Sequence, residues 1–191
     1  MARPVEFDRA HALQSALMLF WSRGYQAASL TDLTEAMGIS RSSFYAAFGD
    51  KRGLFLACLD QFAGRSVGIL TEARTRHPPL EALRTFFGHG FAASVDDRST
   101  WGCLLVNTVL EMADVDEEIC DHARLRLSDV EAAIKACLSE TGCRPEKADE
   151  LSSFLMLVNE GLRVSSRRAL PEMAQRQQID TTFRLLATAL A

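Results

Sequence analysis

Apolar residues recur every three or four positions along nearly the whole chain, which is the spacing of one face of an α-helix. The first such run extends from Asp8 to Arg23 and ends at Gly24, a residue type that tolerates the left-handed conformation found after helix ends. No stretch alternates apolar and polar residues as a half-buried strand does. The five prolines fall where the helical periodicity breaks. The pattern therefore predicts an all-α fold.

Glycine, proline and capping residues divide the chain into about nine predicted helices. Pro78-Pro79 is the clearest boundary. We expect a compact three-helix head, joined by one long helix to a larger bundle. As domains, this gives a head over residues 1–55 and a larger bundle over 56–191. The predicted helices cover residues 8–23, 29–37, 41–48, 51–76, 80–94, 102–113, 116–139, 146–166 and 172–190.

The stretch from Ser29 to Leu54 has the layout of a helix-turn-helix. Two short predicted helices flank the turn Gly38-Ile39-Ser40, where the chain must reverse direction within a few residues. Phe44 and Phe48 are four residues apart, so they share the inward face of the second helix. A single helix fits the major groove of DNA. The face left outward carries Arg41, Ser42, Ser43, Tyr45 and Ala46.

The chemistry of this outward face suits DNA. An arginine can donate two hydrogen bonds to guanine, a serine can reach a base or a phosphate, and a tyrosine hydroxyl can reach a phosphate. Lys51 lies near the start of the next predicted helix. There its charge and the free amide groups of the helix can together hold a phosphate.

The head resembles the DNA-binding domain of the TetR family of bacterial transcriptional regulators. The resemblance covers residues 7–59 and involves several spaced motifs in the same order. These are Phe20-x-x-x-Gly24-Tyr25, Ser29-Leu30-x-x-Leu33, Gly38-Ile39-Ser40-Arg41-Ser42-Ser43-Phe44-Tyr45-x-x-Phe48 and Asp50-Lys51-x-x-Leu54.

The resemblance implies a homodimer on a double-stranded palindromic operator, most simply a ligand- or redox-responsive repressor. The dimer would form through the helices near 146–166 and 172–190, and the bundle would hold the effector. By position, Arg41, Ser42 and Ser43 would read bases, whereas Ser29, Thr31, Tyr45 and Lys51 would contact phosphates. Ser29 is equally well explained as a helix cap, and a short helix has room for Ser42 and Ser43 without any function.

Three positions depart from the family pattern. Ala46 and Ala47 stand where many members carry an aromatic residue or histidine, so phosphate contacts there are in doubt, although Ala46 could touch a thymine methyl group. Thr34 stands where the family usually has a small apolar residue.

The effector site has no comparably specific motif. Ligand cavities are lined mainly by apolar side chains, although such residues are more often simply core. His89 and His122 could be polar groups of a pocket or solvated residues, and no recurring ligand spacing indicates a metal. The apolar candidates for the cavity are Phe86, Phe87, Phe91, Trp101, Leu105, Met112 and Phe154.

Cys103 is the candidate sensor. The run from Trp101 to Asn107 places its thiol in the first turn of a predicted helix, where the helix dipole would lower the thiol pKa. The run resembles that of a TetR subgroup with members that respond to electrophiles or oxidants through a cysteine. An electrophile is therefore one candidate effector, and a buried packing residue is the alternative reading.

Composition and charge limit the other possibilities. The 191 residues are 48% apolar and 24% charged, as in a globular protein. We find neither a signal peptide nor an apolar run long enough to span a membrane, which predicts a cytoplasmic protein. The five cysteines form no CxxC pair, so neither a disulfide framework nor a zinc site is expected, and no cofactor is indicated.

The sequence also bears on two other functional classes. The net charge is −4, and residues 1–55 carry six basic and five acidic residues, so the head is close to neutral. This charge, together with Ala46 and Ala47, would suit an all-helical protein–protein interaction module that has lost DNA binding. An enzyme is not expected, because the chain has no GxSxG, HExxH, P-loop or GxGxxG motif.

Overall fold

The computed structural model describes residues 7–89, 100–168 and 170–190, and within these ranges the chain forms nine α-helices and no strand. The all-α prediction and the order of the elements are confirmed. Phe91, a predicted cavity residue, lies outside the described ranges. The helices are α1 (Arg9–Arg23), α2 (Leu30–Met37), α3 (Arg41–Phe48), α4 (Lys51–Arg76), α5 (Pro79–His89), α6 (Leu104–Met112), α7 (Glu117–Ser139), α8 (Pro145–Ser166) and α9 (Glu172–Leu190).

The short helices of the head begin where their capping residues predict. The Ser29 hydroxyl accepts a hydrogen bond from the Asp32 amide, and the Asp32 side chain accepts one from the Ser29 amide, which completes a capping box on α2. Ser40 caps α3 through the Ser43 amide. Between them, Gly38 adopts the left-handed conformation, with φ of 65°.

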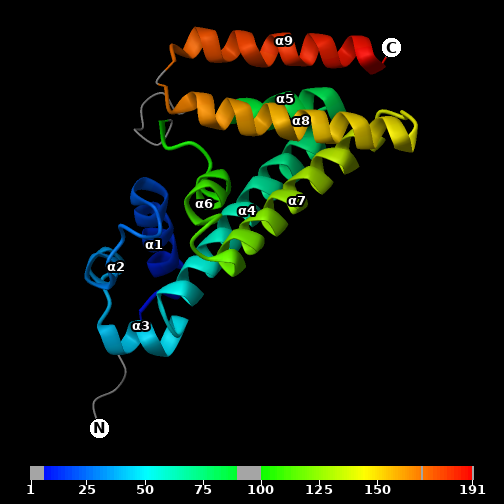
Figure 1. Ribbon diagram of the computed structural model, residues 1–191. Helices are drawn as coiled ribbons and strands as arrows, with labels where there is room; N and C mark the ends of the chain where they lie inside the picture. The colour runs from blue at the N-terminus through cyan, green and yellow to red at the C-terminus, as the bar shows by residue number, and fades with distance from the viewer. Residues whose placement is uncertain (1–6, 90–99, 169, 191) are drawn as a thin grey trace.

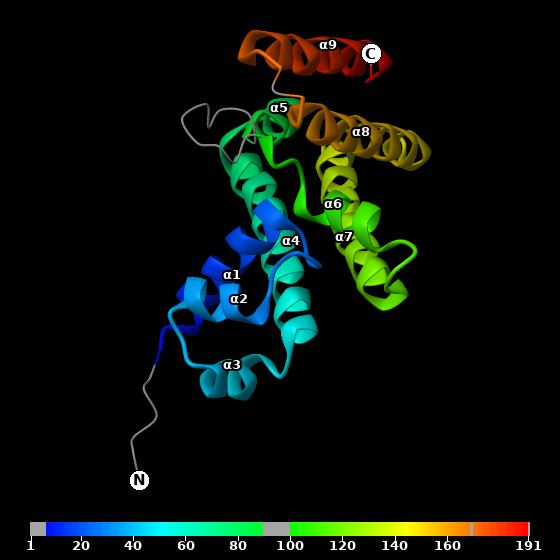
Figure 2. The same cartoon turned by 60° about the vertical axis from the view of Figure 1, so that its left-hand side comes forward.

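Helices α4 and α7 pack side by side along the length of the molecule (Figure 1). The head of α1–α3 lies at one end of this pair, and α9 lies at the opposite end, beyond α8 and α5. The rotated view keeps the same order, with α3 and α9 at opposite ends (Figure 2). Helices α3 and α9 are thus separated by the whole bundle.

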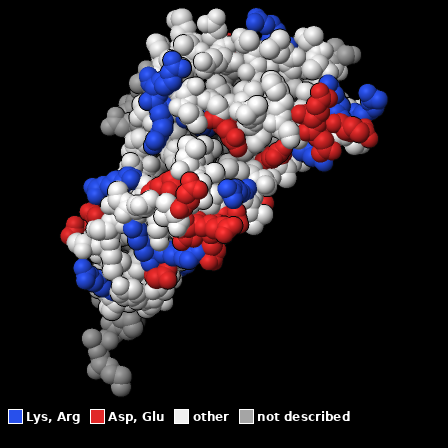
Figure 3. Space-filling model, viewed as in Figure 1, with Lys and Arg blue, Asp and Glu red and all other residues white. Residues whose placement is uncertain are grey.

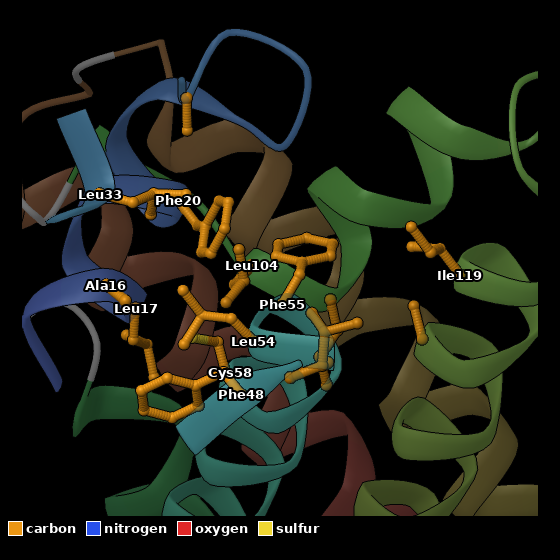
Figure 4. Close-up of a cluster of buried hydrophobic side chains, with 14 of the residues drawn as sticks. Ala16, Leu17, Phe20, Leu33, Phe48, Leu54, Phe55, Cys58, Leu104 and Ile119 are labelled. Atoms are coloured by element: carbon orange, nitrogen blue, oxygen red, sulfur yellow. The ribbon is translucent and has the colours of Figure 1, made fainter. Parts of the chain in front are cut away.

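The core of the head continues directly into the bundle. Side chains from α1, α2, α3 and α4 meet residues of α6 and α7 in one buried cluster (Figure 4). Phe20, Leu33 and Phe44 are fully buried, and the Phe20 and Phe55 rings pack edge to face at 4.7 Å. The position of the head on the bundle is therefore set partly by shared hydrophobic packing.

A second buried cluster joins the other ends of α4 and α7 to α5, α8 and α9. Its largest fully buried side chain is Phe87, which packs edge to face on Phe183 of α9 at 5.3 Å. Among the described helices, α4 alone is long and apolar enough to suit a membrane span by length and composition. It packs against α1, α5, α6 and α7, as the core helix of a globular fold does.

Candidate nucleic-acid interface

Helix α3 presents the outward face that the sequence predicts. Phe44 and Phe48 are buried, whereas Arg41, Ser42 and Ala46 are exposed and Ser43 is half-buried. Tyr45 is 52% exposed, and its ring stands edge-on to Phe44 at 5.4 Å. The inward rings fix the rotation of this short helix, so its polar residues face away from the protein.

The hydroxyl groups at the start of α3 form one small network. The Ser40 hydroxyl lies 2.8 Å from the Ser42 hydroxyl and 3.0 Å from the Ser43 hydroxyl. Each hydroxyl can donate or accept, so the group can reorient without moving the backbone. These hydroxyls are thus suited to exchange partners when a polar surface approaches the N-terminus of α3.

The structure brings two predicted contact residues together across the turn. The Arg41 guanidinium donates a hydrogen bond from Nη2 to the Thr31 hydroxyl at 3.1 Å, from α3 to α2. Both side chains are exposed. The arginine therefore extends along the surface beside α2 and can exchange its single hydrogen bond to a hydroxyl for contacts with a base or phosphate.

Ser29 is occupied as the cap of α2. Its hydroxyl also donates to the Asp32 carboxylate, and the Arg23 guanidinium lies 3.2 Å from the same carboxylate. The hydrogen bonds from the Ser29 side chain and then its backbone hold the pKa of Asp32 below its usual value. The capping interpretation of Ser29 accounts for all of these contacts.

Lys51 is the first residue of α4 and is half-buried. Its amine lies 4.5 Å from the centre of the Tyr25 ring, a cation–π contact. Burial lowers the pKa of Lys51, and the nearby Glu111 carboxylate acts in the opposite direction. The amine is thus held at a defined place beside the N-terminus of α4.

Thr34, which departs from the family pattern, has a structural explanation. It is buried, and its hydroxyl donates to the carbonyl oxygens of Leu30 at 3.0 Å and Thr31 at 3.1 Å. The polar group is therefore satisfied within its own helix, and the methyl group can pack as a small apolar residue would.

On the face of the head that Figure 3 shows, basic and acidic side chains intermingle. Arg52 turns toward the bundle, where its guanidinium lies 3.0 Å from Asp116 and 2.5 Å from Glu118. Arg9, which the sequence analysis did not single out, stacks over the Phe48 ring at 4.9 Å and so adds a positive charge beside α3. The sequence gives no sign of this contact, because Arg9 and Phe48 are 39 positions apart.

A cavity of about 220 Å³ lies between α4, α6, α7 and α8. Of the predicted cavity residues, Phe86, Cys103 and Leu105 line it, and so does His89. The apolar part of the wall is completed by side chains that include Trp21, Phe62, Ile69 and Met156, and the polar part by Arg65, Ser66, Asn159, Arg163 and Ser166.

Four predicted cavity residues do not line this cavity. Met112 is buried in the cluster that joins the head to the bundle, and Phe87 is buried in the second cluster. Each of these two side chains fills space between helices. Trp101 packs edge-on against Trp21, which lines the cavity, but Trp101 itself does not line it. Phe154 was placed by helical spacing alone, yet it is 44% exposed on the outer face of α8. His122 instead pairs with Asp60 at 2.7 Å.

The expectation of an acidic Cys103 thiol is wrong. Cys103 precedes α6 as its N-cap residue and is buried. Burial raises the pKa of the thiol, and this outweighs the backbone hydrogen bonds and the Arg163 charge that act in the opposite direction. The thiol still lines the cavity, so a ligand in the cavity would lie beside it.

In the part of the chain that the structure describes, no three His, Cys, Asp or Glu side chains lie close enough together to hold a metal ion. All five cysteines are free thiols.

Comparison with known proteins agrees with the geometry of the head and of the bundle. Residues 12–58 match the family described as bacterial regulatory proteins, tetR family, and residues 79–170 match the C-terminal domain of LmrA/YxaF-like transcriptional regulators. The HTH-type transcriptional repressor ComR of Escherichia coli (strain K12) is 29% identical over 96% of this chain and 90% of its own length. The HTH-type transcriptional regulator YezE of Bacillus subtilis (strain 168) is 31% identical over 70% of this chain and 69% of its own length.

Solved structures show the same fold. A cysteine mutant of the TetR family regulator CifR, complexed with 26-base-pair operator DNA, superposes with a TM-score of 0.74. It is 29% identical and covers 95% of this chain and 98% of its own. The chain described here belongs to the TetR family of bacterial transcriptional regulators.

Proposed function

We propose that this TetR-family regulator is a repressor that binds a palindromic operator as a homodimer and is released by an effector in the bundle cavity. The observation that carries the proposal is the outward polar face of α3, which is held in place by the buried Phe44 and Phe48 rings. The operator complex of CifR supports it, because that protein shares the fold along nearly its whole length.

In this proposal Arg41, Ser42 and Ser43 read bases from the major groove. Thr31 and Tyr45 contact phosphates, as does Lys51 at the start of α4. Ser29 contributes mainly by capping α2, because its hydroxyl is already bonded to Asp32. The exposure of Arg41, Ser42 and Tyr45 supports these roles, since a base or phosphate can reach them without rearrangement of the core.

The homodimer would form through the outer faces of α8 and α9. Large apolar side chains are exposed there, and Leu157 at 67% and Met173 at 81% are the most exposed of them. Exposed apolar side chains gathered on adjacent helices are typical of a contact surface. The same faces carry Phe154, Val164 and Leu185.

The cavity suits a small organic effector. Its volume of about 220 Å³ exceeds the roughly 150 Å³ that holds benzene in an engineered protein cavity. Because α4 contributes to its wall and also begins at the head, a ligand there could shift the spacing of the two heads. The shift requires that the ligand bind one spacing more tightly than the other. An electrophile that modifies Cys103 remains one candidate effector.

We further propose that the protein acts in the cytoplasm, without a cofactor, and that it catalyses no reaction. The regulator family to which it belongs supports this view. The activity proposed for it is therefore a change in DNA occupancy.

The test is to pass sheared genomic DNA over the purified protein and to sequence the fragments that it retains. We expect enrichment of an inverted repeat with half-site centres about 34–36 Å apart, and loss of that enrichment in an Arg41→Ala variant. Equal, non-selective retention by both proteins would refute sequence-specific binding. Absence of any salt-dependent retention would favour the protein–protein interaction module instead.

A further inference from the structure

One side chain of the bundle forms hydrogen bonds with the backbone of the head. The Glu111 carboxylate, on α6, accepts hydrogen bonds from the backbone amides of Tyr25 at 3.0 Å and Gln26 at 2.8 Å. These two amides belong to the turn between α1 and α2, 85 and 86 residues away in the sequence. Each oxygen of the carboxylate is used by one amide, so the contact fixes both the position and the direction of the turn.

The turn is shaped to receive this carboxylate. Gly24 has a φ of 86°, in the region that favours glycine. A Cβ atom built on Gly24 would lie only 2.8 Å from a Glu111 oxygen. Glycine at this position thus serves two needs, because it ends α1 and leaves room for a side chain from another part of the chain.

The same place holds a predicted phosphate contact. The Lys51 amine lies over the Tyr25 ring, and the charge of Glu111 favours its protonated form. Three parts of the molecule therefore meet here: the turn after α1, the start of α4 and the end of α6. A displacement of Glu111 would move the turn and the place of the Lys51 amine together.

Helix α6 connects this contact to the cavity. Gly102 and Cys103 directly precede α6 and Leu105 is its second residue, and all three line the cavity. Glu111 is the penultimate residue of the same helix. Nine helical residues span about 13 Å. A short rigid helix of this kind transmits a movement at one end to the other.

We infer that Glu111, through its two bonds from the end of α6, is a positioning residue that sets the orientation of the DNA-binding head on the bundle. Its consequence for DNA rests on the proposed function, because in a homodimer the orientation of each head determines the separation of the two α3 helices. Its structural basis, the carboxylate that holds two backbone amides, does not depend on DNA.

The first test measures hydrogen exchange of the Tyr25 and Gln26 amides in the full chain. Glu111→Gln keeps the size of the side chain and removes its charge. We expect both amides to exchange about tenfold faster or more, because a neutral amide oxygen cannot replace two charge-assisted bonds. Asp114→Asn, an exposed carboxylate shortly after α6, is the matched control and should leave both rates unchanged. Unchanged exchange in Glu111→Gln would overturn the inference.

The second test measures the spacing preference on DNA. An operator fragment from the retention experiment is compared with a copy carrying one extra base pair between its half-sites. We expect wild type and Asp114→Asn to discriminate strongly between the two, and Glu111→Gln to lose about fivefold or more of that discrimination. A role in stability alone would lower the melting temperature and leave the spacing preference intact, which would also overturn the inference.

The two tests separate the two ideas. If wild type retained no DNA, the proposed function would fail, and amide exchange would still decide whether Glu111 holds the head. If exchange increased in Glu111→Gln while the spacing preference remained that of wild type, the role of Glu111 in DNA recognition would be refuted. Glu111→Asp, which keeps the charge on a side chain one carbon shorter, should recover part of both effects.

Discussion

Lys51 provides the sharpest test of how the head holds DNA. Its amine lies over the Tyr25 ring, and its stem is half-buried at the start of α4. Lys51→Met keeps an unbranched side chain against the ring and removes the charge, so the packing of the head should change little. The variant therefore isolates the electrostatic contribution of one ammonium group per head.

The expected change can be worked out from counterion release. Each phosphate neutralised by a protein cation contributes about 0.9 to the slope of log affinity against log salt concentration. A homodimer carries two copies of Lys51, so the slope should become shallower by about 1.8. Between 50 and 200 mM salt, wild type should then lose roughly tenfold more affinity than the variant loses.

The measurement is an operator titration at four or more salt concentrations, with fluorescence anisotropy as the readout. Lys147→Met, near the start of α8 and far from the head, serves as the control and should keep the wild-type slope. The variant should also bind specific and unrelated DNA less tightly by similar factors, because a phosphate contact carries no sequence information. A Lys51→Met slope equal to that of wild type would remove Lys51 from the phosphate contacts.

Three further predictions follow from particular side chains. Arg41→Ala should weaken operator binding by roughly 1–3 kcal/mol and relax the preference at one base position, as a panel of single-base operator variants would show; a uniform loss across the panel would contradict base reading. Leu157→Arg should shift the protein from dimer to monomer in analytical ultracentrifugation, because it places a charge in the proposed contact face, and an unchanged dimer would exclude that face. The pKa of Cys137 is raised to about 11 by burial, so the folded state keeps this proton after the unfolded state has lost its own near pH 9. The free energy of unfolding should therefore fall between pH 9 and 11, less steeply in Cys137→Ala, and parallel profiles in urea unfolding would contradict this account.

Most of the fold can be predicted from helix caps and helical spacing, because these features involve residues close together in the sequence. The Ser29 and Asp32 capping box and the Ser40 cap depend on residues at most three positions apart, so the bounds of α2 and α3 could be predicted closely. Helical spacing also placed Phe44 and Phe48 inside correctly. These rules concern a single helix and its ends.

The features that escaped prediction depend on other parts of the chain. The burial of Cys103 arises from the helices packed around it, which spacing along one helix cannot indicate. Phe154 has the same spacing as inward residues of α8, yet it faces outward, because spacing identifies a stripe and not the partner that covers it. The bond between Glu111 and the Tyr25 amide had no signal beyond Gly24, which has a sufficient local explanation as a helix end.

The charge count of the head illustrates the same difference. The side chains of Asp8, Asp32 and Asp50 all accept hydrogen bonds from backbone amides at the start of helices α1, α2 and α4. The positive ends of these helices partly offset three of the five acidic charges in residues 1–55. A count of formal charges therefore understates how well the near-neutral head suits DNA.

The count of basic charges in the head must also be corrected, because some of these charges are paired with carboxylates. Arg52 is paired with Asp116, the N-cap residue of α7, and with Glu118 in its first turn, so it contributes little to the field around α3. Among the residues that the structure describes, the basic side chains of the head outside such ion pairs are Arg9, Arg41 and Lys51. In the proposed homodimer, a head with so few such cations would bind DNA with a shallow salt dependence. Its specificity would then come mainly from base contacts and from the spacing of the two heads. This is why the orientation of the head, and the Glu111 contact that sets it, matters more here than it would in a strongly basic head.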